Sequence, residues 1–402
     1  MARFLNVVDV SEAVAASIAI APDPVPEAVP LEDAAGRVLS ADIFAGEDIP
    51  GFDRSVVDGF ALRAEDTTSS TESAPALFHC TGRILMGAGE SRFPVSKGTC
   101  VYLPTGGVMP AGADAIVMTE YTELIGDTVL VKRSVAYGEN LLRKDEDFRK
   151  GALVLPKGRR LNPQDSGVLA ACGKTEVMVA KKPIVGIISS GNELVEISAT
   201  PGPGQVRDAN ASMLAAWLRE YGCVPRLFGI VRDERESFDA ALSMALTECD
   251  VVLLSGGSSK DDRDMTAGVI AELGSVLVHG VAIAPGKPTI IGKIGEKPVF
   301  GLPGHPASAY VVLTVIVRPL LDHMLGASKP FVRITPATLG DNLPSQKGRE
   351  EYVRVRLEDG IAYPVFGKSG LLNTLVNSDG LVRIPANAEG MEAGTRIEVI
   401  LW

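Results

Sequence analysis

The residues best suited to chemistry lie directly after a short apolar run in the second half of the chain. Val251 to Leu254 is followed by S-G-G-S-S and then by K-D-D-R-D, which ends at Asp264. An apolar run too short for a helix predicts a buried strand of a parallel sheet, and helical spacing begins at Thr266. The N–H groups of the glycine-containing turn can bind an anion, and Lys260 adds positive charge. Carboxylates beside a phosphate site at this edge of a sheet suggest a magnesium-bridged phosphate compound.

The three carboxylates of this segment have a second explanation. Asp261, Asp262 and Asp264 are placed where acidic side chains cap the first N–H groups of a helix and complement its dipole. That role needs no ligand. The pattern of this one segment therefore does not decide between a ligand site and acidic residues that only cap a helix.

Two other segments repeat the same plan. Pro183 to Glu193 reads P-I-V-G-I-I-S-S-G-N-E, and Val299 to Ser308 reads V-F-G-L-P-G-H-P-A-S before an apolar segment from Ala309 to Val317. Each is an apolar strand followed by glycine with serine or proline. If the strands are parallel, their three ends meet on one rim of the sheet and form a single phosphate-binding crevice.

Composition limits the class of protein. A chain of 402 residues with 46% hydrophobic residues can build several cores, and we expect about two to four domains. The balance of 50 acidic against 39 basic residues, a net charge of −11, argues against nonspecific binding to nucleic acid or an anionic membrane. We expect a cytoplasmic protein, because no signal-peptide pattern opens the chain and the apolar run near residue 310 is interrupted at Arg318 and Pro319.

The cysteines favour reduced thiols over disulfides or a zinc site. They are odd in number, scattered, and without a C-x-x-C pair. His79 beside Cys80 is the nearest approach to a metal pair, but neighbours on a strand point to opposite faces. The five are Cys80, Cys100, Cys172, Cys223 and Cys249.

The hydrophobic pattern predicts several kinds of domain in turn. Helical spacing after Ser11 predicts an N-terminal helix over Val10 to Ile20, and short apolar runs between glycine and proline turns predict an all-β part from Leu77 to Val131. Alternating strands and helices from about residue 182 to 326 predict a parallel, doubly wound three-layer α/β domain. After Lys329 the pattern returns to strands and predicts a small β-barrel or sandwich. The strands expected there are Phe331 to Ile334, Tyr352 to Leu357, Leu381 to Ile384 and Arg396 to Leu401.

Two further groups of charged residues have open interpretations. Asp53 and Asp58 lie in F-D-R-S-V-V-D-G-F-A, where carboxylates are most often solvated turn residues. Gly138 to Phe148, G-E-N-L-L-R-K-D-E-D-F, carries mixed charges that form either a solvated face or a place for a metal and a phosphate together.

Seven motifs, taken in order along almost the whole chain, resemble the molybdopterin molybdenumtransferases, the MoeA family that includes the E domain of gephyrin. The motifs are F-D-R-S-V-V-D-G-F-A, T-G-G-V-M-P-A-G-A-D-A-I-V, G-E-N-L-L-R-K-D-E-D-F, S-S-G-N-E-L, S-G-G-S-S-K-D-D-R-D, P-G-K-P and G-L-P-G-H-P-A-S. One such motif is weak, whereas seven in the same order are specific.

The resemblance implies a multidomain α/β plus β protein that forms a homodimer. Its expected parts are a discontinuous linker domain (1–50 and 145–181), a small β-rich domain (51–144), a molybdopterin-binding α/β domain (182–326) and a C-terminal β-barrel (327–402). The α/β domain is expected to face the small β domain of the partner subunit. The implied reaction uses Mg²⁺, takes adenylylated molybdopterin and molybdate as substrates, inserts the metal at the dithiolene and releases AMP.

The resemblance also implies the site residues. The catalytic residues by motif position are Asp58, Asp147, Asp264 and Lys287, and the metal ligands are Asp233 and Asp264. Arg354 and Ser369 resemble an oxyanion-facing pair, with Ser308 as a further hydroxyl donor. The full set expected to bind the molybdopterin compound is Ser190, Gly191, Glu193, Ser255, Gly256, Gly257, Ser258, Pro303, Gly304, Pro306, Ser308, Arg354 and Ser369.

Three positions depart from the family's usual residues. Asn192 stands where an aspartate is usual, which removes a charge but keeps hydrogen bonding. Ala284 stands where K-P-G-K-P has its first lysine, which should weaken molybdate binding unless another base replaces that cation. His305 stands where asparagine is usual; it is either that replacement base or a residue that merely caps the helix opening at Pro306.

Three functions fit these residues to different degrees. The first is an insertase for molybdenum, or alternatively for tungsten, with a molybdopterin adenylyltransferase and molybdoenzymes as expected protein partners. The second is a non-catalytic cofactor-binding or scaffold protein on the same fold, but the retained acidic residues and Lys287 favour the enzyme. The third is a molybdopterin adenylyltransferase, against which the long flanks outside residues 182–326 argue.

Overall fold

A computed structural model describes residues 7–89, 92–232, 234–256 and 260–402, and it leaves the side chains of residues 260–264 outside the description. The chain divides into two compact units. The first unit comprises residues 1–41, 157–162 and 176–402, and the second comprises residues 42–156 and 163–175. The division into four domains stays a prediction.

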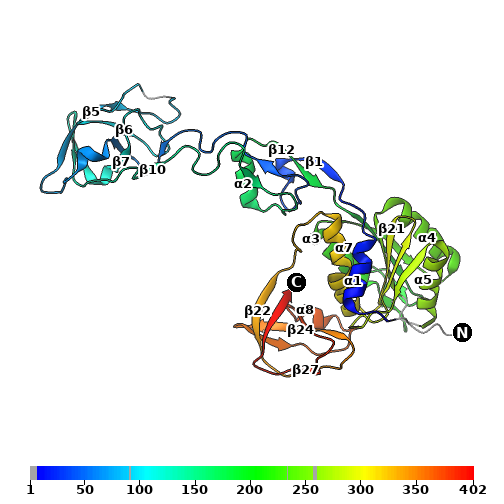
Figure 1. Ribbon diagram of the computed structural model, residues 1–402. Helices are drawn as coiled ribbons and strands as arrows, with labels where there is room; N and C mark the ends of the chain where they lie inside the picture. The colour runs from blue at the N-terminus through cyan, green and yellow to red at the C-terminus, as the bar shows by residue number, and fades with distance from the viewer. Residues whose placement is uncertain (1–6, 90–91, 233, 257–259) are drawn as a thin grey trace. The chain divides into compact units, whose positions relative to one another are not determined.

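A six-stranded sheet forms the centre of the first unit (Figure 1). Its order is β16-β13-β17-β21-β20-β18, in which the first four strands are parallel and β20 runs antiparallel to both of its neighbours, β21 and β18. The doubly wound α/β fold is confirmed, but a fully parallel sheet is wrong at one edge. There, β20 and β21 are joined by a two-residue hairpin turn at Gly295 and Glu296 instead of a helix. The strands are β13 (Ile184–Ser190), β16 (Val224–Val231), β17 (Val251–Gly256), β18 (Ser275–His279), β20 (Ile290–Ile294) and β21 (Lys297–Leu302).

Helices cover both faces of this sheet because its central strands are apolar on both sides. In β17, Val251 and Leu253 pack into one core cluster, whereas Val252 and Leu254 pack into another. Buried strands of parallel sheets show this continuous apolar pattern. The first face is covered by α1 (Val10–Ala19), α3 (Ala209–Tyr221), α6 (Pro306–Val312), a π-helical turn (Leu313–Val317) and α7 (Arg318–Met324), and the second by α4 (Arg235–Glu248) and α5 (Lys260–Leu273).

Helix α1 begins at Val10 as predicted, whereas the start of α5 differs from the sequence prediction. Helix α1 is capped by Asp9, whose side chain accepts from Glu12 N at 2.8 Å in a reciprocal capping box, so the cap lies before Ser11. Helix α5 begins at Lys260 instead of Thr266. Its acidic segment is therefore inside the first turns of the helix, where carboxylates are favoured by the dipole.

The run Pro306–Met324 is the one helical segment in the described chain that is long and apolar enough to cross a membrane. Its most apolar window is 78% buried inside the protein. That burial is the pattern of a core helix, because the helix packs against the sheet of the first unit.

The C-terminal strands close into a small barrel, as predicted. The order β24-β25-β22-β28-β26 returns to its start through a β24–β26 pairing. The expected strand at Phe331 is wrong: the Phe331 ring instead meets the Tyr221 ring edge-on at 5.9 Å, outside the barrel. The strands are β22 (Ile334–Leu339), β24 (Glu350–Glu358), β25 (Ile361–Pro364), β26 (Gly380–Ile384) and β28 (Arg396–Leu401), with the short pair β23 (Leu343–Pro344) and β27 (Gly390–Met391) and helix α8 (Asn373–Val376) beside them.

Two pairs of short strands, the two-residue strand β19 (Ile283–Ala284) beside the start of β24, and a 3₁₀ turn complete the first unit. Strands β1 (Pro26–Pro30) and β12 (Glu176–Ala180) form an antiparallel pair, and β14 (Leu194–Val195) pairs in parallel with β15 (Val206–Arg207). A 3₁₀ turn, Leu31–Asp33, follows β1.

The second unit is mostly β, as expected from its short apolar runs. Its main sheet has the order β7-β4-β6-β5-β9-β8 around a core that includes Phe60, Phe78 and Val117. The strands are β4 (Gly59–Leu62), β5 (Ala76–Arg83), β6 (Thr99–Leu103), β7 (Ala115–Met118), β8 (Thr122–Ile125) and β9 (Thr128–Val131). Two short pairs, helix α2 (Pro163–Ala171) and two 3₁₀ turns (Ala64–Thr67 and Thr119–Tyr121) complete the unit; the pairs are β2 (Ile43–Phe44) with β11 (Leu153–Leu155), and β3 (Arg54–Ser55) with β10 (Leu141–Leu142).

All five cysteines are free thiols. Burial raises the pKa of the Cys100 and Cys223 thiols to about 12. These two thiols are therefore protonated core residues and poor nucleophiles at neutral pH.

Candidate functional site

The ends of three neighbouring parallel strands form one rim of the first unit's sheet. Ser190 at the end of β13 lies opposite Gly256 at the end of β17, and Ser255 lies opposite Leu302 at the end of β21. The predicted convergence of the three strand ends is confirmed. Gly257 and Ser258, which the sequence predicted for the same rim, lie outside the described residues.

Glycine is required where β13 and β17 end. A Cβ at Gly256, which has φ +153°, would lie 2.0 Å from Ser190 O. A Cβ at Gly191, with φ +152°, would lie 2.6 Å from a Glu193 carboxylate oxygen. At Gly256 the backbones of β13 and β17 therefore approach so closely that only glycine fits, whereas Gly191 faces the Glu193 side chain in a backbone conformation that favours glycine. The buried Ser190 and Ser255 lie beside them.

Asn210 joins two of the three strand ends. Its Nδ2 donates to Ser255 Oγ at 3.1 Å and to Gly304 O at 2.8 Å from the first turn of α3. The side chain is 8% exposed, and its Oδ1 has no hydrogen-bond partner among the described residues. Sequence reasoning missed Asn210, because its role depends on a contact 94 residues away along the chain.

A tight loop carries Lys287 next to this rim. Val281 N donates to Lys287 O at 2.9 Å, and Thr289 Oγ1 donates to Gly286 O at 2.7 Å, so the loop is closed at both ends. Lys287 is exposed on it. Pro288 lines a small recess together with Ser190 and Gly256, which makes the loop and the strand ends neighbours.

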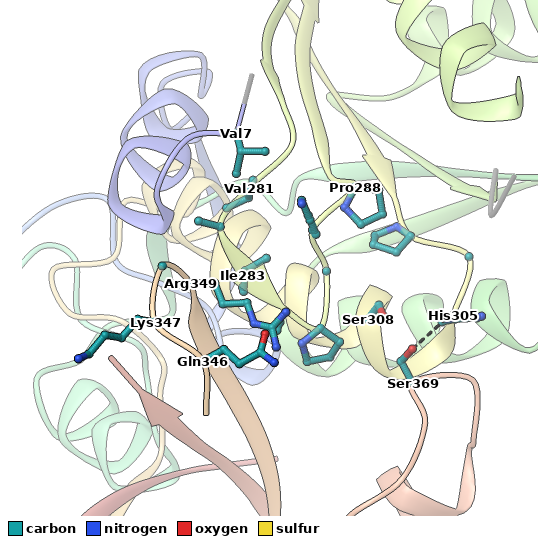
Figure 2. Close-up of a pocket in the computed structure, with 18 residues that line it drawn as sticks. Val7, Val281, Ile283, Pro288, His305, Ser308, Gln346, Lys347, Arg349 and Ser369 are labelled. Atoms are coloured by element: carbon teal, nitrogen blue, oxygen red, sulfur yellow. Dashed lines mark hydrogen bonds between the residues drawn. The ribbon is translucent and has the colours of Figure 1, made fainter. Parts of the chain in front are cut away.

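The loop borders a cavity of about 470 Å³ between the α/β sheet and the C-terminal barrel (Figure 2). Four basic residues line the cavity, and its described lining includes no aspartate or glutamate. Five predicted site residues meet here, namely Pro303, Gly304, Ser308, Lys287 and Ser369. The basic residues are Lys287, His305, Lys347 and Arg349.

His305 connects helix α6 to the barrel instead of only opening the helix. It occupies the N-cap position of α6, but its side chain makes no capping hydrogen bond. Its Nδ1 lies 2.9 Å from Ser369 Oγ, the contact drawn in Figure 2. Ala307 N also donates to Ser369 O at 3.1 Å. The capping explanation is therefore incomplete, since the imidazole orients a hydroxyl of the cavity wall.

Arg354 and Pro306 are predicted site residues that adjoin the cavity-lining segments without lining the cavity themselves. Arg354 is 8% exposed and donates from Nη2 to Gly367 O at 2.9 Å, behind the loop that carries Ser369. Burial lowers the pKa of this guanidinium. Pro306 is the first residue of α6, where its ring fits the helix start.

Arg349, Lys347 and Gln346 reach the cavity and were missed from the sequence. They lie in Q-K-G-R, directly before the E-E-Y-V-R segment that contains Arg354. The available signal was an Arg only five positions before the predicted one. The local sequence does not show which of these two arginines lines the cavity, because that depends on how the barrel packs against the α/β domain.

The acidic residues predicted from the first half of the chain belong to the second unit. Asp58 Oδ1 accepts from Thr105 N at 2.6 Å and from Thr105 Oγ1 at 3.1 Å, so this carboxylate holds the turn after β6. Asp147 is exposed. In the same charged run, Asp145 pairs with Arg149 at 2.9 Å, which is typical of a solvated face.

No group of three or more potential metal-ligating His, Cys, Asp or Glu side chains occurs within the described residues. Asp233 and the side chain of Asp264, the two predicted metal ligands, lie outside that part of the chain.

Comparison with known proteins places this geometry in a family. Three family descriptions match successive parts of the chain: the MoeA N-terminal region (domain I and II) at residues 8–173, a probable molybdopterin binding domain at 186–323, and the MoeA C-terminal region (domain IV) at 336–402. A molybdopterin molybdenumtransferase of Bacillus subtilis is 34% identical over 93% of this chain and 89% of its own length. The chain belongs to the MoeA family. A putative molybdopterin biosynthesis protein of Methanocaldococcus jannaschii is 32% identical over 93% of this chain and 91% of its own length.

A solved structure supports the MoeA fold over the full chain. The MoeA protein of Pyrococcus horikoshii aligns with a TM-score of 0.88 at 34% identity, covering 99% of this chain and 100% of that one. The MoeA family thus includes both the α/β domain and the flanking β-rich parts seen here.

Proposed function

We propose that this chain acts in molybdenum cofactor biosynthesis as a molybdopterin molybdenumtransferase. It inserts molybdate-derived metal into adenylylated molybdopterin, with Mg²⁺-dependent release of AMP. The observation that carries the proposal is the basic cavity beside the three strand ends. Its four basic side chains, with no carboxylate in the described lining, suit a tetrahedral dianion such as molybdate.

The two parts of the site have different roles in this proposal. The strand ends, with Ser190, Gly191, Ser255 and Gly256, offer backbone N–H groups and hydroxyls to the phosphate of the molybdopterin compound. Lys287, Ser308 and Ser369 offer donors to the oxyanion in the neighbouring cavity. Holding both substrates side by side supplies the positioning that metal insertion needs.

The remaining predicted residues serve the same substrates. We assign Gly257, Ser258, Glu193, Pro303, Gly304 and Pro306 to the molybdopterin side, and Arg354 to support of the loop that carries Ser369. Asp58 and Asp147 are assigned to catalysis. Cleaving a phosphate linkage mainly requires neutralisation of charge.

Magnesium is assigned to Asp233 and Asp264. Carboxylate oxygens are the usual protein ligands of Mg²⁺, and this ion usually also binds substrate phosphates. When bound, it would neutralise phosphate charge. The assignment depends on the family resemblance, because the described side chains include no metal cluster.

A cytoplasmic homodimer is part of the proposal. The small β domain of one subunit would face the α/β domain of its partner, so that Asp58 and Asp147 act on the partner's substrates. A molybdopterin adenylyltransferase would supply the adenylylated substrate, and molybdoenzymes would receive the product.

Two alternatives remain distinct from this function. A scaffold or cofactor-binding protein would keep the cavity but release no AMP, and a tungsten enzyme would respond to tungstate at lower concentrations than to molybdate. An adenylyltransferase built from residues 182–326 does not explain the family matches at 8–173 and 336–402.

The deciding experiment measures AMP release from adenylylated molybdopterin by the purified protein. Mg²⁺ is present, and molybdate and tungstate are titrated separately. We expect oxyanion-dependent release, with a higher half-saturating oxyanion concentration for Lys287→Ala than for wild type. Tight binding of the molybdopterin compound without AMP release would overturn the insertase and support the scaffold.

A further inference from the structure

We propose that a second cavity of the first unit binds an aromatic anion, a planar ring that carries a phosphate or another acidic group. The cavity has a volume of about 380 Å³, and small-molecule sites usually measure about 300–1,000 Å³. Its walls come from α3, the helical run from α6 to α7, the segment before β22 and the end of β28. It shares no lining residue with the cavity beside Lys287, so this binding site is separate from the one in the proposed function.

Five aromatic side chains line this second cavity, and most of them are held by their neighbours. The rings of Trp217 and Tyr221 are stacked, with centroids 4.5 Å apart and planes 10° from parallel. Tyr310 meets the Trp402 ring edge-on at 4.8 Å, and Trp402 Nε1 donates to Ser378 O at 2.6 Å. These rings therefore present faces and edges in a fixed arrangement, which suits contact with a planar ring.

Three arginines make the cavity positive in a chain whose net charge is −11. They come from three separate segments, and Glu220 is the one acidic residue among the described lining residues. None of the three forms an ion pair within the described part of the chain. The guanidinium of the first lies 4.5 Å from the centroid of the Phe331 ring, so charge and aromatic surface are adjacent. The arginines are Arg160, Arg318 and Arg333.

Two buried polar atoms at the cavity have no hydrogen-bond partner among the described residues. Thr314 is 6% exposed in the π-helical turn, and its Oγ1 is one of these atoms; Nε of Arg318 is the other. The carboxyl of Asp322, which lies near Arg318, instead accepts from the Tyr221 hydroxyl. Unpaired buried groups cost free energy, and π-helical turns are frequent at functional sites. An anionic oxygen in the cavity would accept from both groups.

An aromatic anion uses both parts of this lining. Inorganic phosphate would pair with the arginines but leave the rings without a contact, whereas an uncharged ring would leave the arginines without an anion. A ring joined to a phosphate satisfies both, because charge-assisted hydrogen bonds orient it and stacking adds contact area.

Tryptophan fluorescence tests the proposal, because the chain has two tryptophans and both, Trp217 and Trp402, line this cavity. The purified full-length protein is titrated with AMP, with adenosine and with inorganic phosphate in separate arms. We expect AMP to change the emission in a saturable way and phenyl phosphate to compete with it. Adenosine and inorganic phosphate should bind about tenfold more weakly or less, because each lacks one half of the ligand. No saturable change with either AMP or phenyl phosphate would overturn the proposal.

Substitution of an exposed arginine tests the charged part of the cavity with little risk to folding. Arg333→Ala should weaken AMP binding about tenfold or more, and Arg333→Lys should recover part of the loss. The matched control is Arg396→Ala, because Arg396 is also exposed and lies on β28, whose end lines the cavity, but does not line it itself. Equal AMP affinity of Arg333→Ala and Arg396→Ala would contradict a role for the arginines.

Thr314→Val separates binding from structure. The hydroxyl has no partner among the described residues, so its removal should leave the thermal stability of the free protein unchanged or raised. AMP binding should nevertheless weaken, because the ligand loses a hydrogen bond. Lower stability with unchanged AMP affinity would show that the hydroxyl is structural and would reject it as a ligand contact.

Lys287→Ala distinguishes this cavity from the proposed substrate site. In that variant the AMP-dependent change in tryptophan emission should equal that of wild type, even if AMP release from adenylylated molybdopterin is lost. Loss of the emission change in Lys287→Ala, with no loss in Arg333→Ala, would place AMP beside Lys287 and reject the second site.

Discussion

Single polar side chains connect parts of the first unit that are far apart in sequence. Asn210 links the ends of β17 and β21, and His305 links α6 to the loop of Ser369. Asn210 does so with a buried side chain, where an unpaired group is costly, whereas His305 is exposed. At this scale, the positions of the site residues depend on side chains that themselves need not touch substrate.

Replacing Asn210 with alanine should loosen the rim and destabilise the fold. The change leaves Ser255 Oγ and Gly304 O without their donor, and we expect a loss of about 1–3 kcal/mol in the free energy of unfolding. Urea unfolding measures the loss, and binding of the molybdopterin compound should weaken in parallel. Asn377→Ala, at an exposed position, is the control and should change neither quantity; equal stability of the two variants would contradict the role of Asn210.

Asp322 makes stability depend on pH. This carboxyl is 9% exposed on α7 and accepts from the Tyr221 hydroxyl. Burial raises its pKa above the ordinary 3.8, against the opposing effects of the Tyr221 hydrogen bond and of Arg318. The native state therefore holds the proton more tightly than the unfolded state, so its contribution to stability is greatest below pH 3.8 and is lost as pH rises through the raised pKa.

Asp322→Asn should remove this dependence. Relative to the variant, the wild-type free energy of unfolding should fall as pH rises from about 4 to 8. Urea unfolding of both proteins at several pH values measures the difference. If the free energies of unfolding of the two proteins changed with pH in the same way over that range, Asp322 would not be a source of pH-dependent stability.

At the scale of elements, the loop that carries Lys287 depends on close packing against the helix behind it. Gly286 has φ +127°, and a Cβ there would lie 2.7 Å from Val312 Cγ2. The loop can approach α6 only because position 286 has no side chain. Its shape is thus fixed by a helix and two hydrogen bonds, whereas Lys287 remains exposed.

Gly286→Ala should destabilise the protein by about 1–3 kcal/mol and weaken molybdate binding, because both strain and overlap oppose the added methyl group. Gly268→Ala is a matched substitution with the opposite expected sign. Gly268 is exposed in the middle of α5 with open space around it, so alanine should stabilise the helix by about 0.5–1 kcal/mol. Thermal unfolding compares the two, and a stabilised Gly286→Ala would refute the packing argument.

Elements and strand ends could be predicted where the signal is local. Val251 to Leu254 predicted β17, and glycine with serine marked the turns that meet on the rim. Contacts between the α/β domain and the barrel could not be predicted from local sequence. Strand β19 is only two residues long, which is too short to recognise. Its pairing with β24 puts Arg349 in the cavity lining, whereas Arg354 lies behind the lining. Phe331 was assigned to a strand because its neighbours are apolar, but that pattern also suits packing on α3.

At the scale of the whole molecule, the proposed site needs residues from both units. Lys287 belongs to the first unit, and Asp58 belongs to the second. A homodimer in which each site combines Lys287 of one subunit with Asp58 of the other follows from the family resemblance. Sedimentation should give twice the chain mass of 42.3 kDa, and a monomer would contradict the shared site.

Mixing two variants, assayed at a molybdate concentration too low for Lys287→Ala to release AMP, tests the shared site directly. Asp58→Ala and Lys287→Ala subunits are dissociated, mixed in equal amounts and reassociated. Half of the dimers then combine both variants, and each of these has one of its two sites intact, so about a quarter of wild-type AMP release should return. Either variant treated alone is the control, and continued inactivity of the mixture would place both residues of a site in one subunit.

The cavity walls come from opposite ends of the chain, and this has a consequence for synthesis on the ribosome. Val8 pairs with Val281 beside the Lys287 loop, whereas Arg349 and Ser369 lie in the last strands and turns to emerge. Translation delivers the α/β sheet first and the barrel afterwards, and domains generally fold as units in that order. A nascent chain therefore passes through a stage in which the strand ends for the phosphate have formed but the barrel's contribution to the cavity has not. The completed cavity is thus restricted to chains that have been translated at least through Ser369.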